Sequence, residues 1–457
     1  MRVAIVGAGA GGLSAAFDLA GAGAQVTVFE AADQVGGLAA GFRLPRWEWS
    51  VEQFYHHWFA SDADVLRLAE ELGVRARVTF PWPMTAAYHQ GGFYVLDGPL
   101  TAAIPGPRWL DRVPGAGLLA RGLHALRFPA LSLADTLRYG WMGLYLTRTS
   151  NWRPLEAFRA HEWLLQRSGS HGYQVLWQPL LEGKFGPHYR DVNMAWFWAR
   201  VKARTPRLGT FEGGFQAFLD VLAERVQARG VQLRLRTPIE RVDPLPDGRV
   251  ELKVASGAEG FDHCLVTTSP GLLARLVPTL PEEYLRGLLA LRSMGSISLV
   301  LALRQQLSTE GFYWHNLPKS AGFPFLALVE HTNFVSPARF GGDHIVYCGD
   351  YLDPDHEYFS LSKEALLERF LPALSRFNPA FEPSWVRDSW LFRTPYAQPV
   401  PGLSHSRNIP PLETPLRGLW FASMSQVYPW DRGTNFAIRI ARQAAARIVA
   451  DERRAAA

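Results

Sequence analysis

Short apolar runs separated by glycine and polar turns open the chain. Residues 3–6 are apolar without interruption, which is typical of a strand buried on both faces of a parallel sheet. Residues 11–20 form an apolar helical segment, and a second apolar run at 26–29 ends in Glu30. This order predicts a strand, a turn, a helix and a second parallel strand, the repeating unit of an α/β sheet.

Similar patterns return much later in the chain. A segment with helical periodicity follows Gly213-Gly214, and residues 262–266 form another buried run. Near the C-terminus, residues 418–422 predict a strand and a helix begins near Asn435. Alternating apolar residues also predict short strands at 231–235, 239–242 and 249–254.

Two long sections interrupt this α/β pattern. The first, roughly 80–200, is rich in Pro, Trp and Leu and is predicted to be mainly helical. The second, 280–405, contains strand-like runs at 296–303, 325–330 and 344–347 that predict a mixed sheet. A chain of 457 residues is too long for one simple core, so we expect two interleaved domains.

Composition and charge argue against several classes of protein. The formal net charge is +5, but Lys and Arg are scattered, so no nucleic-acid partner is expected. No apolar stretch reaches the length of about 18 residues that a membrane-spanning helix needs. Cys264 and Cys348 lie in separate strand-like runs without metal-spaced neighbours, so we expect neither a disulfide nor a metal site. These features predict a cytoplasmic protein.

The glycine turn at the N-terminus predicts a nucleotide site. Gly7 permits a tight turn, Gly9 lets a pyrophosphate approach the backbone, and Gly12 lets the helix pack closely on the sheet. The start of that helix, with Ala10 and Gly11, offers free N–H groups to phosphates. Glu30 ends the second strand, where a carboxylate can accept both ribose hydroxyls, so the segment predicts an adenosine diphosphate cofactor.

These motifs occur in one order with Gly36-Gly37, Gly213-Gly214, the strand at 239–242, the run 262–270 and the C-terminal strand, loop and helix. Together they resemble the flavin superfamily of amine oxidases, protoporphyrinogen oxidases, phytoene desaturases and UDP-galactopyranose mutases. The likeness is closest to the protoporphyrinogen-oxidase-like and desaturase-like branch. The resemblance implies an α/β fold with a discontinuous Rossmann-type, GR2-like FAD-binding domain and an interleaved α+β substrate domain.

The resemblance also implies where each domain and the cofactor lie. The FAD-binding domain would comprise 1–78, 205–275 and 410–452, and the substrate domain 79–204 and 276–409, with its helical part at 99–200. The implied FAD-binding residues are Gly7, Gly9, Ala10, Gly11, Gly12, Glu30, Gly36, Gly37, Leu38, Ile239, Thr267, Ser423, Met424, Asp431, Asn435 and Phe436.

Three departures from the amine oxidase pattern refine this picture. Leu38 stands where amine oxidases usually carry Arg, and Ser423-Met424 stand where their last strand runs into Gly and an acid. No Cys lies near the C-terminal loop, so non-covalent FAD is expected. No second dinucleotide motif follows, so the substrate itself is expected to supply the electrons.

Three residues are candidates for chemistry beside the flavin. His56, in an aromatic segment, is either a proton acceptor or a hydrogen-bonded wall residue, and the wall is favoured. Lys184 is either a catalytic lysine or a surface ion pair with Glu182, and the ion pair is favoured. Trp430 is an aromatic face in a loop next to Asp431 and Arg432, whose alternative role is a loop held by a contact between those two residues.

The apolar stretch 114–128, with 144–146 close behind, could contact a membrane surface. A helix packed inward is the favoured alternative, because its glycines weaken it as an independent amphipathic helix. Peripheral attachment at the inner face of the cell membrane therefore stays a secondary expectation.

Taken together, the sequence predicts an FAD-dependent oxidoreductase. It would dehydrogenate a hydrophobic or polycyclic small molecule by hydride transfer to flavin N5, and oxygen or a quinone would reoxidise the flavin. The alternatives are a non-redox flavin mutase of a sugar nucleotide, an amine oxidase, and a flavin-binding scaffold. No motif identifies the substrate or the oligomeric state.

Overall fold

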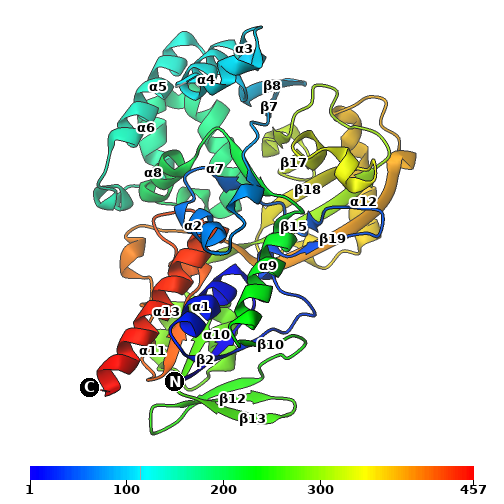
Figure 1. Cartoon of the computed structure of the whole chain (residues 1–457). Coiled ribbons are helices and arrows are strands. Elements are labelled where there is room, and N and C mark those ends of the chain that lie inside the picture. The colour runs from blue at the N-terminus through cyan, green and yellow to red at the C-terminus, as the bar shows by residue number, and fades with distance from the viewer. Residues whose placement is uncertain (114, 457) are drawn as a thin grey trace.

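A five-stranded parallel sheet joins segments from both ends of the chain in the computed structural model, which describes residues 1–113 and 115–456 (Figure 1). Its central strand is β1 (Arg2–Val6), which pairs with β2 (Gln25–Phe29) on one side and β14 (His263–Val266) on the other. The outer strands are β10 (Gln232–Arg234) and β20 (Leu419–Phe421). In order of appearance along the chain the sheet reads 3-2-1-4-5, so its direction of growth reverses at β1.

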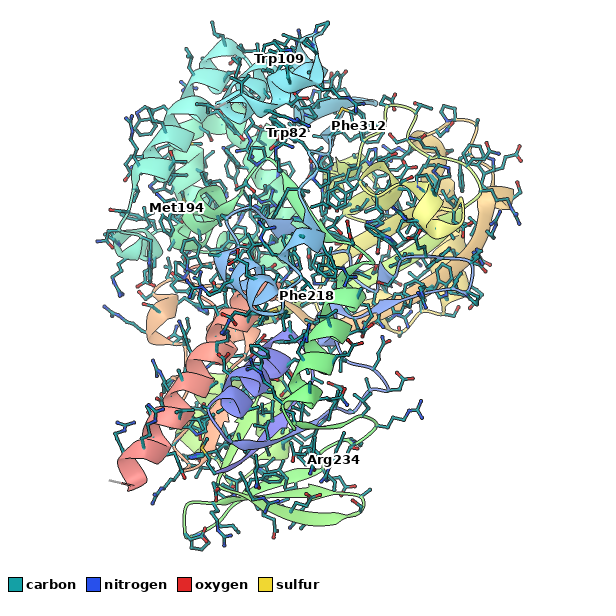
Figure 2. All side chains as sticks on the ribbon, in the orientation of Figure 1. Trp82, Trp109, Met194, Phe218, Arg234 and Phe312 are labelled. Atoms are coloured by element: carbon teal, nitrogen blue, oxygen red, sulfur yellow. The ribbon has the colours of Figure 1, made fainter. Side chains whose placement is uncertain are left out.

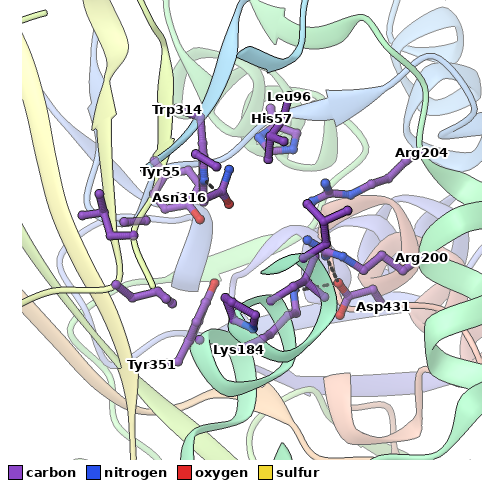
Figure 3. Close-up of a pocket in the computed structure, with 18 of the residues that line it drawn as sticks. Tyr55, His57, Leu96, Lys184, Arg200, Arg204, Trp314, Asn316, Tyr351 and Asp431 are labelled. Carbon is purple, nitrogen blue, oxygen red and sulfur yellow. Dashed lines mark hydrogen bonds and ion pairs between the residues drawn. The ribbon is translucent and has the colours of Figure 1, made fainter. Parts of the chain in front are cut away.

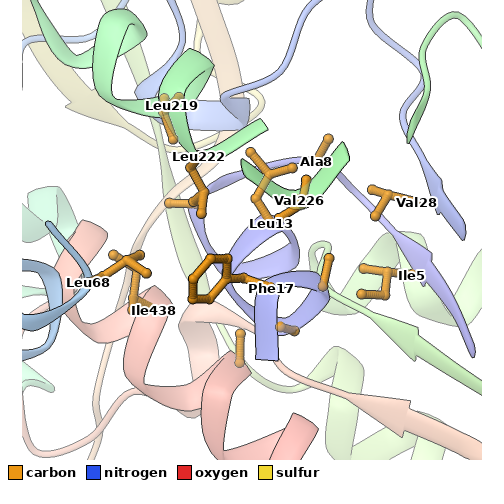
Figure 4. Close-up of a cluster of buried hydrophobic side chains, with 14 of the residues drawn as sticks. Ile5, Ala8, Leu13, Phe17, Val28, Leu68, Leu219, Leu222, Val226 and Ile438 are labelled. Atoms are coloured by element: carbon orange, nitrogen blue, oxygen red, sulfur yellow. The ribbon is translucent and has the colours of Figure 1, made fainter. Parts of the chain in front are cut away.

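Alternate residues of β1 enter two different cores. Val3 and Ile5 pack with α1 (Ala10–Gly21), α9 (Phe215–Ala228) and α13 (Thr434–Ala456), which cover one face of the sheet (Figure 4). Ala4 and Val6 face the other core, under α10 (Pro270–Leu276) and α11 (Glu282–Leu289). Because both faces are buried, the strand is apolar at every position from 3 to 6.

The second face of this sheet is also covered by a small antiparallel sheet. It consists of β11 (Arg241–Pro244), β12 (Val250–Val254) and β13 (Gly257–Phe261). β11 and β12 match the strands predicted at 239–242 and 249–254, whereas no strand was predicted at the position of β13. Short strands tie the region to the rest of the chain: β3 (Gly41–Phe42), β4 (Val51–Glu52), β5 (Trp58–Phe59), β6 (Val78–Thr79) and β9 (Leu208–Phe211).

A seven-stranded mixed sheet forms the second part of the molecule (Figure 1). In spatial order its strands are β19 (Val386–Pro399), β15 (Ser293–Leu303), β18 (His344–Leu352), β17 (Ala327–Glu330), β16 (Trp314–Asn316), β7 (Thr85–His89) and β8 (Gly92–Asp97). All neighbours are antiparallel except β16 and β7. The helix α12 (Lys363–Phe370) contributes to the core on one face of this sheet.

The hairpin of β7 and β8 corrects the prediction that the section from residue 80 onward is mainly helical. Its turn contains Gln90 and Gly91 at φ +45° and +91°. Such left-handed positions are typical of tight hairpin turns, so the Gly91-Gly92 pair was the local signal.

Helices dominate residues 100–203, which gather at one end of the molecule (Figure 1). The capping box of Ser132 and Asp135 starts α5, and aromatic side chains including Trp163, Phe185 and Trp196 fill the core between the helices. The helices are α3 (Leu100–Ala103), α4 (Ala116–Arg127), α5 (Leu133–Arg148), α6 (Ala160–Gly172), α7 (Gln178–Phe185) and α8 (Met194–Ala203). A further helix, α2 (Ala63–Glu71), lies against α13. Among the described residues, no helix combines the length and the apolar character needed to cross a bilayer.

We predict that Gly12→Ala destabilises the protein strongly. A Cβ at residue 12 would lie 1.9 Å from the Gly7 carbonyl oxygen, so the turn or the helix must shift. Overpacking of this kind costs about 1–3 kcal/mol or more in the free energy of unfolding. Thermal unfolding followed by circular dichroism should show a lower midpoint. Gly271→Ala is the matched control, because no atom lies within 4 Å of its Cβ position; a Gly12→Ala protein that melts with the wild type would contradict the expectation.

Candidate cofactor and substrate site

A cavity of about 500 Å³ opens at the carboxyl ends of β1 and β14. The N-terminal glycine turn forms one wall, and the loop after β20 forms another. Twelve of the sixteen predicted cofactor residues line it: Gly7, Gly9, Ala10, Gly11, Gly12, Glu30, Gly36, Gly37, Leu38, Thr267, Ser423 and Met424. We call this space the cofactor cavity.

Two glycine turns lie against each other in the cofactor cavity. Gly7 has φ +107° and Gly36 has φ +129°, conformations that favour glycine. Gly9 faces Gly36 in an isolated parallel bridge, and the Gly36 N–H donates to the Ala8 carbonyl oxygen at 2.9 Å. Gly9 is also the N-cap of α1 and gives no side-chain cap, and the first turn contains no acidic residue. The free N–H groups of this turn therefore suit an anionic group such as a diphosphate.

Glu30 fixes the glycine turn and retains acceptor capacity. One carboxylate oxygen accepts from the Ala8 N–H at 2.8 Å, and the other accepts from the Ala32 N–H at 2.9 Å. A carboxylate has about four acceptor positions, so two are left for hydroxyl groups in the cavity.

Buried polar atoms farther along the cofactor cavity have no partner among the described residues. They are Ser298 Oγ, Asp350 Oδ1 and Arg432 Nε. Burial raises the pKa of Asp350 to about 7, so its carboxyl group can donate as well as accept near neutral pH. Buried polar groups are nearly always hydrogen-bonded, so these atoms fit a ligand with a polar ring edge.

The other four predicted cofactor residues lie elsewhere. Ile239 lines no part of the cofactor cavity and packs beside the buried side chains under the sheet. Asn435 accepts from the N–H groups of Asp64 and Val65 at 2.9 and 3.0 Å, which ties α13 to the start of α2. Asp431, Asn435 and Phe436 instead line a second cavity.

The second cavity, of about 390 Å³, adjoins the first (Figure 3). It lies where the helical region, the seven-stranded sheet and the start of α13 meet. Tyr55, His56, Trp314, Tyr351 and Arg432 line both cavities. Apolar side chains line much of the rest: Leu96, Phe128, Leu176, Leu180, Leu317 and Leu326. We call this space the substrate cavity, since a ligand in it would touch a ligand in the cofactor cavity.

His56 stands at the junction of the two cavities. Burial lowers its pKa to about 4, and burial lowers the pKa of His57 to about 3. Both imidazoles are therefore neutral near pH 7. His56 Nδ1 lies against the Phe54 carbonyl oxygen, so a neutral ring carries its proton on Nδ1 and leaves Nε2 as an acceptor.

The expectation that Lys184 forms a surface ion pair with Glu182 is wrong. Only 13% of the Lys184 side chain is exposed, and its Nζ lies 2.8 Å from Asp431 Oδ2. Glu182 accepts instead from Gln178 at 2.7 Å. Residues two apart on a helix face different directions, so Lys184 and Glu182 on α7 are poorly placed to meet.

The alternative for this loop, a contact between the Asp431 and Arg432 side chains, is not formed. From Arg432, Asp431 accepts the backbone N–H alone, and the Arg432 guanidinium contacts the Tyr351 hydroxyl. The carboxylate pairs with Lys184 and, at 3.5 Å, with Arg200. Burial alone would raise the Asp431 pKa, but the neighbouring cations outweigh burial and hold it well below its usual range. Burial also lowers the pKa of Lys184.

Trp430 lines neither cavity. Its ring stacks on Phe436 at a centroid distance of 5.7 Å and packs against Trp198 at 5.6 Å. Trp430 therefore packs on the side of the loop that faces away from both cavities.

Several lining residues escaped the sequence analysis. Tyr351 comes from β18 of the second sheet, and no local motif distinguishes it from a core residue. Arg200 and Arg204 are four residues apart at the end of α8, and this spacing on one helix face was an available signal.

Comparisons with known proteins agree with this geometry. The model of the flavin containing amine oxidoreductase family matches residues 10–449. An L-amino-acid oxidase from Crotalus adamanteus is 61% identical over 46 residues, which cover 10% of this chain and 9% of that protein. The chain thus matches about a tenth of the length of that curated relative.

Three solved structures share the fold over nearly the whole chain. A protein assigned as a protoporphyrinogen oxidase from Exiguobacterium sp. 255-15 has a TM-score of 0.75 at 19% identity, covering 98% of this chain and 99% of its own. Cyclohexylamine oxidase from Brevibacterium oxydans IH-35A has 0.68 at 15%, with 99% of both chains covered. A reduced UDP-galactopyranose mutase has 0.71 at 13%, covering 98% and 95%. At these identities the likeness establishes the fold, and the extended family match establishes that this chain belongs to the flavin-containing amine oxidoreductase family.

Proposed function

We propose that this protein is an FAD-dependent oxidoreductase that dehydrogenates a hydrophobic or polycyclic substrate by hydride transfer to flavin N5. Family membership supports the flavin and the oxidoreductase chemistry. The observation that carries the rest is the shared wall of Tyr55, His56, Trp314 and Tyr351 between the cofactor and substrate cavities. A substrate beside this wall would lie against the cofactor, and oxygen or a quinone would reoxidise the flavin.

We propose FAD rather than a smaller flavin as the cofactor. We infer that Glu30 holds the ribose of the adenosine and that the start of α1 holds the diphosphate. The strand order 3-2-1-4-5 supports a Rossmann-type, GR2-like domain, because such sheets bind dinucleotides at the point where strand order reverses. Non-covalent binding is proposed because no Cys is among the described residues that line either cavity.

The strands of the two sheets support the domain boundaries that we propose. All strands of the parallel sheet fall within 1–78, 205–275 and 410–452. All strands of the seven-stranded sheet fall within 79–204 and 276–409. The first set would be the FAD-binding domain and the second the substrate domain, with the helical part at 99–200.

The chain's own residues would position the substrate and manage a proton. A bound flavin supplies the acceptor for a hydride equivalent. Tyr55, Trp314 and Tyr351 would hold the substrate against it and exclude water. We propose His56 Nε2 as the proton acceptor; its pKa of about 4 means that it would hold the proton only briefly.

One observation favours a second candidate, a non-redox mutase of a sugar nucleotide. Lys184, Arg200 and Arg204 give the substrate cavity a basic side, which an anionic nucleotide would require. The same charges disfavour an amine oxidase, whose cationic substrate they would repel. A mutase would be active only with reduced flavin.

The helical end of the molecule supports peripheral attachment to a membrane. Trp109 projects from it into solvent with 62% of its surface exposed (Figure 2). Residues 109–145 contain ten of the thirteen large hydrophobic residues exposed among those described: Trp109, Val113, Leu118, Leu119, Leu126, Leu133, Leu137, Trp141, Leu144 and Tyr145. One face of α4 packs inward as favoured, with Ala116 and Ala120 buried, whereas Leu118 on the other face is 82% exposed.

The charge of this apolar face suits an anionic lipid surface. Residues 100–150 contain six Arg and only two acidic residues, Asp111 and Asp135. Asp111 is bonded to Thr101, and Asp135 is buried at the start of α5. We propose that α4 and α5 rest on an anionic membrane leaflet, with cytoplasmic location still a prediction.

Vesicle binding tests the attachment. Sedimentation with vesicles of phosphatidylcholine and phosphatidylglycerol should carry down the wild type, less so at high salt. The double variant Leu118→Asp with Leu137→Asp should lose more than about tenfold in partitioning, because each leucine loses about 1.5–3 kcal/mol of apolar transfer. Leu289→Asp is the control, since Leu289 is 60% exposed outside the patch. Equal sedimentation of the double variant and the control would refute the attachment.

FAD affinity tests the role of Glu30. We expect Glu30→Gln to weaken FAD binding by about tenfold or more, because a charge-assisted hydrogen bond contributes about 1.5–3 kcal/mol. Titration of the apoprotein with FAD, followed by flavin fluorescence, measures the dissociation constant. The exposed Asp33, on the same loop, provides the control Asp33→Asn. Unchanged affinity in Glu30→Gln would remove Glu30 from the site.

Anaerobic reduction tests the reaction itself. The purified protein should be yellow, and an apolar substrate from a panel of porphyrinogens, polyenes and amines should bleach the flavin, whereas NADH should not. Turnover of a sugar nucleotide only after dithionite reduction would support the mutase instead. If no compound in the panel reduces the flavin, the proposed reaction fails.

A further inference from the structure

Basic side chains outnumber carboxylates around the substrate cavity. Four cations line it, Lys184, Arg200, Arg204 and Arg432, against two carboxylates, Asp62 and Asp431. The Asp62 carboxylate already has a backbone partner, because it accepts from the Phe59 N–H at 2.8 Å. Two of the three histidines that line the cavity, His56 and His57, are neutral at pH 7 because burial lowers their pKa. Basic side chains therefore outnumber carboxylates by two in the cavity, and Asp431 is the carboxylate that pairs with them.

Three of the four basic side chains come from the ends of two helices, α7 and α8. Lys184 lies in the last turn of α7, Arg200 lies in the last turn of α8, and Arg204 is the C-cap residue that follows α8. These three residues line the substrate cavity but not the cofactor cavity. Figure 3 shows Arg200 and Arg204 directing their guanidinium groups into the cavity from the same side. We call Lys184, Arg200 and Arg204 the cationic wall.

Asp431 cannot neutralise the whole wall. Its Oδ2 lies 2.8 Å from Lys184 Nζ and 3.5 Å from Arg200, and its Oδ1 accepts from Trp196 Nε1 at 3.2 Å. Its carboxylate is thus already engaged on both oxygens. Arg204 makes no ion pair or hydrogen bond with any described residue, and its exposed side chain opens onto the cavity.

Helix ends explain part of this arrangement but not all of it. The C-terminal ends of α7 and α8 carry partial negative charge, which favours Lys184 and Arg200 where they stand. That effect contributes about 0.3–1 kcal/mol at exposed sites, less than the cost of removing cations such as Lys184 and Arg200 from bulk water. Arg204 lies over the Phe59 ring at 5.7 Å, but no carboxylate pairs with it among the described residues.

Apolar side chains line much of the rest of the same cavity: Leu96, Phe128, Leu176, Leu180 and Leu326. A ligand that satisfied both parts of the cavity would have an apolar body and a negatively charged head.

We propose that the cationic wall binds a carboxylate or phosphate on an otherwise apolar substrate, with Arg204 as its main contact. This inference rests on the proposed function, because it specifies the substrate class of the same site. Arg204 would act as a specificity-determining residue: it orients the substrate through its charged head, and the carbon that is oxidised lies at the other end of the cavity.

Binding of matched eight-carbon probes to the FAD-loaded protein tests the proposal. The probes are octanoate, octyl phosphate, octanol and octylamine. The flavin visible spectrum and tryptophan fluorescence report binding, the latter also without flavin. We expect an anionic probe to bind at least tenfold more tightly than octanol or octylamine. Octanoate and octyl phosphate distinguish a carboxylate head from a phosphate head.

Arg204→Gln should remove this preference. Its affinity for the anionic probe should fall about tenfold while its affinity for octanol stays unchanged, and Arg204→Lys should restore part of the loss. Arg138→Gln is the matched control, because Arg138 is an exposed arginine on the apolar face of α5 and reports any binding of the probes to that surface.

Each other outcome has a separate meaning. Equal binding of octanol and the anions, or an Arg204→Gln protein with wild-type preference, would overturn the cationic wall as a ligand site. A protein that holds FAD and is reduced by a neutral apolar compound, without preferring anions, would refute this inference and leave the proposed function standing. A protein that prefers anions by tryptophan fluorescence but takes up no FAD would support this inference and refute the proposed function.

Discussion

Close packing between α1 and α13 is the constraint on which the site depends. Gly11 on α1 lies so near α13 that an added Cβ would be 3.2 Å from the Ala437 carbonyl oxygen. Ala441 and Ala444 continue this face of small residues, and Arg442 closes it with an ion pair to Asp18 at 2.8 Å. Because the two helices approach so closely, the loop before α13 lies beside the glycine turn before α1. Both walls of the cofactor cavity follow from that single contact.

The two cavities differ mainly in the charge of the residues that line them. The cofactor cavity offers backbone N–H groups and neutral hydroxyls, which suit a ligand with distributed charge. The substrate cavity instead gathers full cations around Asp431, and burying such groups is costly unless each is paired. A buried charge cluster is weak evidence for stability, so this one is better explained by what it contacts than by what it adds to the fold.

Sequence analysis could predict the cofactor cavity because its residues belong to local motifs. Gly7, Gly9, Gly12 and Glu30 are held in register by two strands and the turn and helix between them, so their spacing alone indicates their arrangement. The family resemblance added the C-terminal pair, Ser423 and Met424. Both lie in that cavity.

The substrate cavity could not be predicted in the same way. Its walls come from β16, β18, α7 and α8, which meet only through tertiary packing, and aromatic residues there look like core residues in sequence. Proximity in the chain was also a poor guide to ion pairs. Asp431 reaches Lys184, 247 positions away, rather than its neighbour Arg432.

The parallel sheet has a consequence for the order in which the protein can form during synthesis. Its central strand β1 pairs with β14, and β14 in turn pairs with β20, so one edge of the sheet exists only after residue 421 has left the ribosome. Until then the apolar surfaces of β14 and α1 lack their partners, and such exposed surfaces favour aggregation. Four of the five strands can pair once residue 266 is available, but the β20 edge and the α13 side of α1 are completed only at the end of translation.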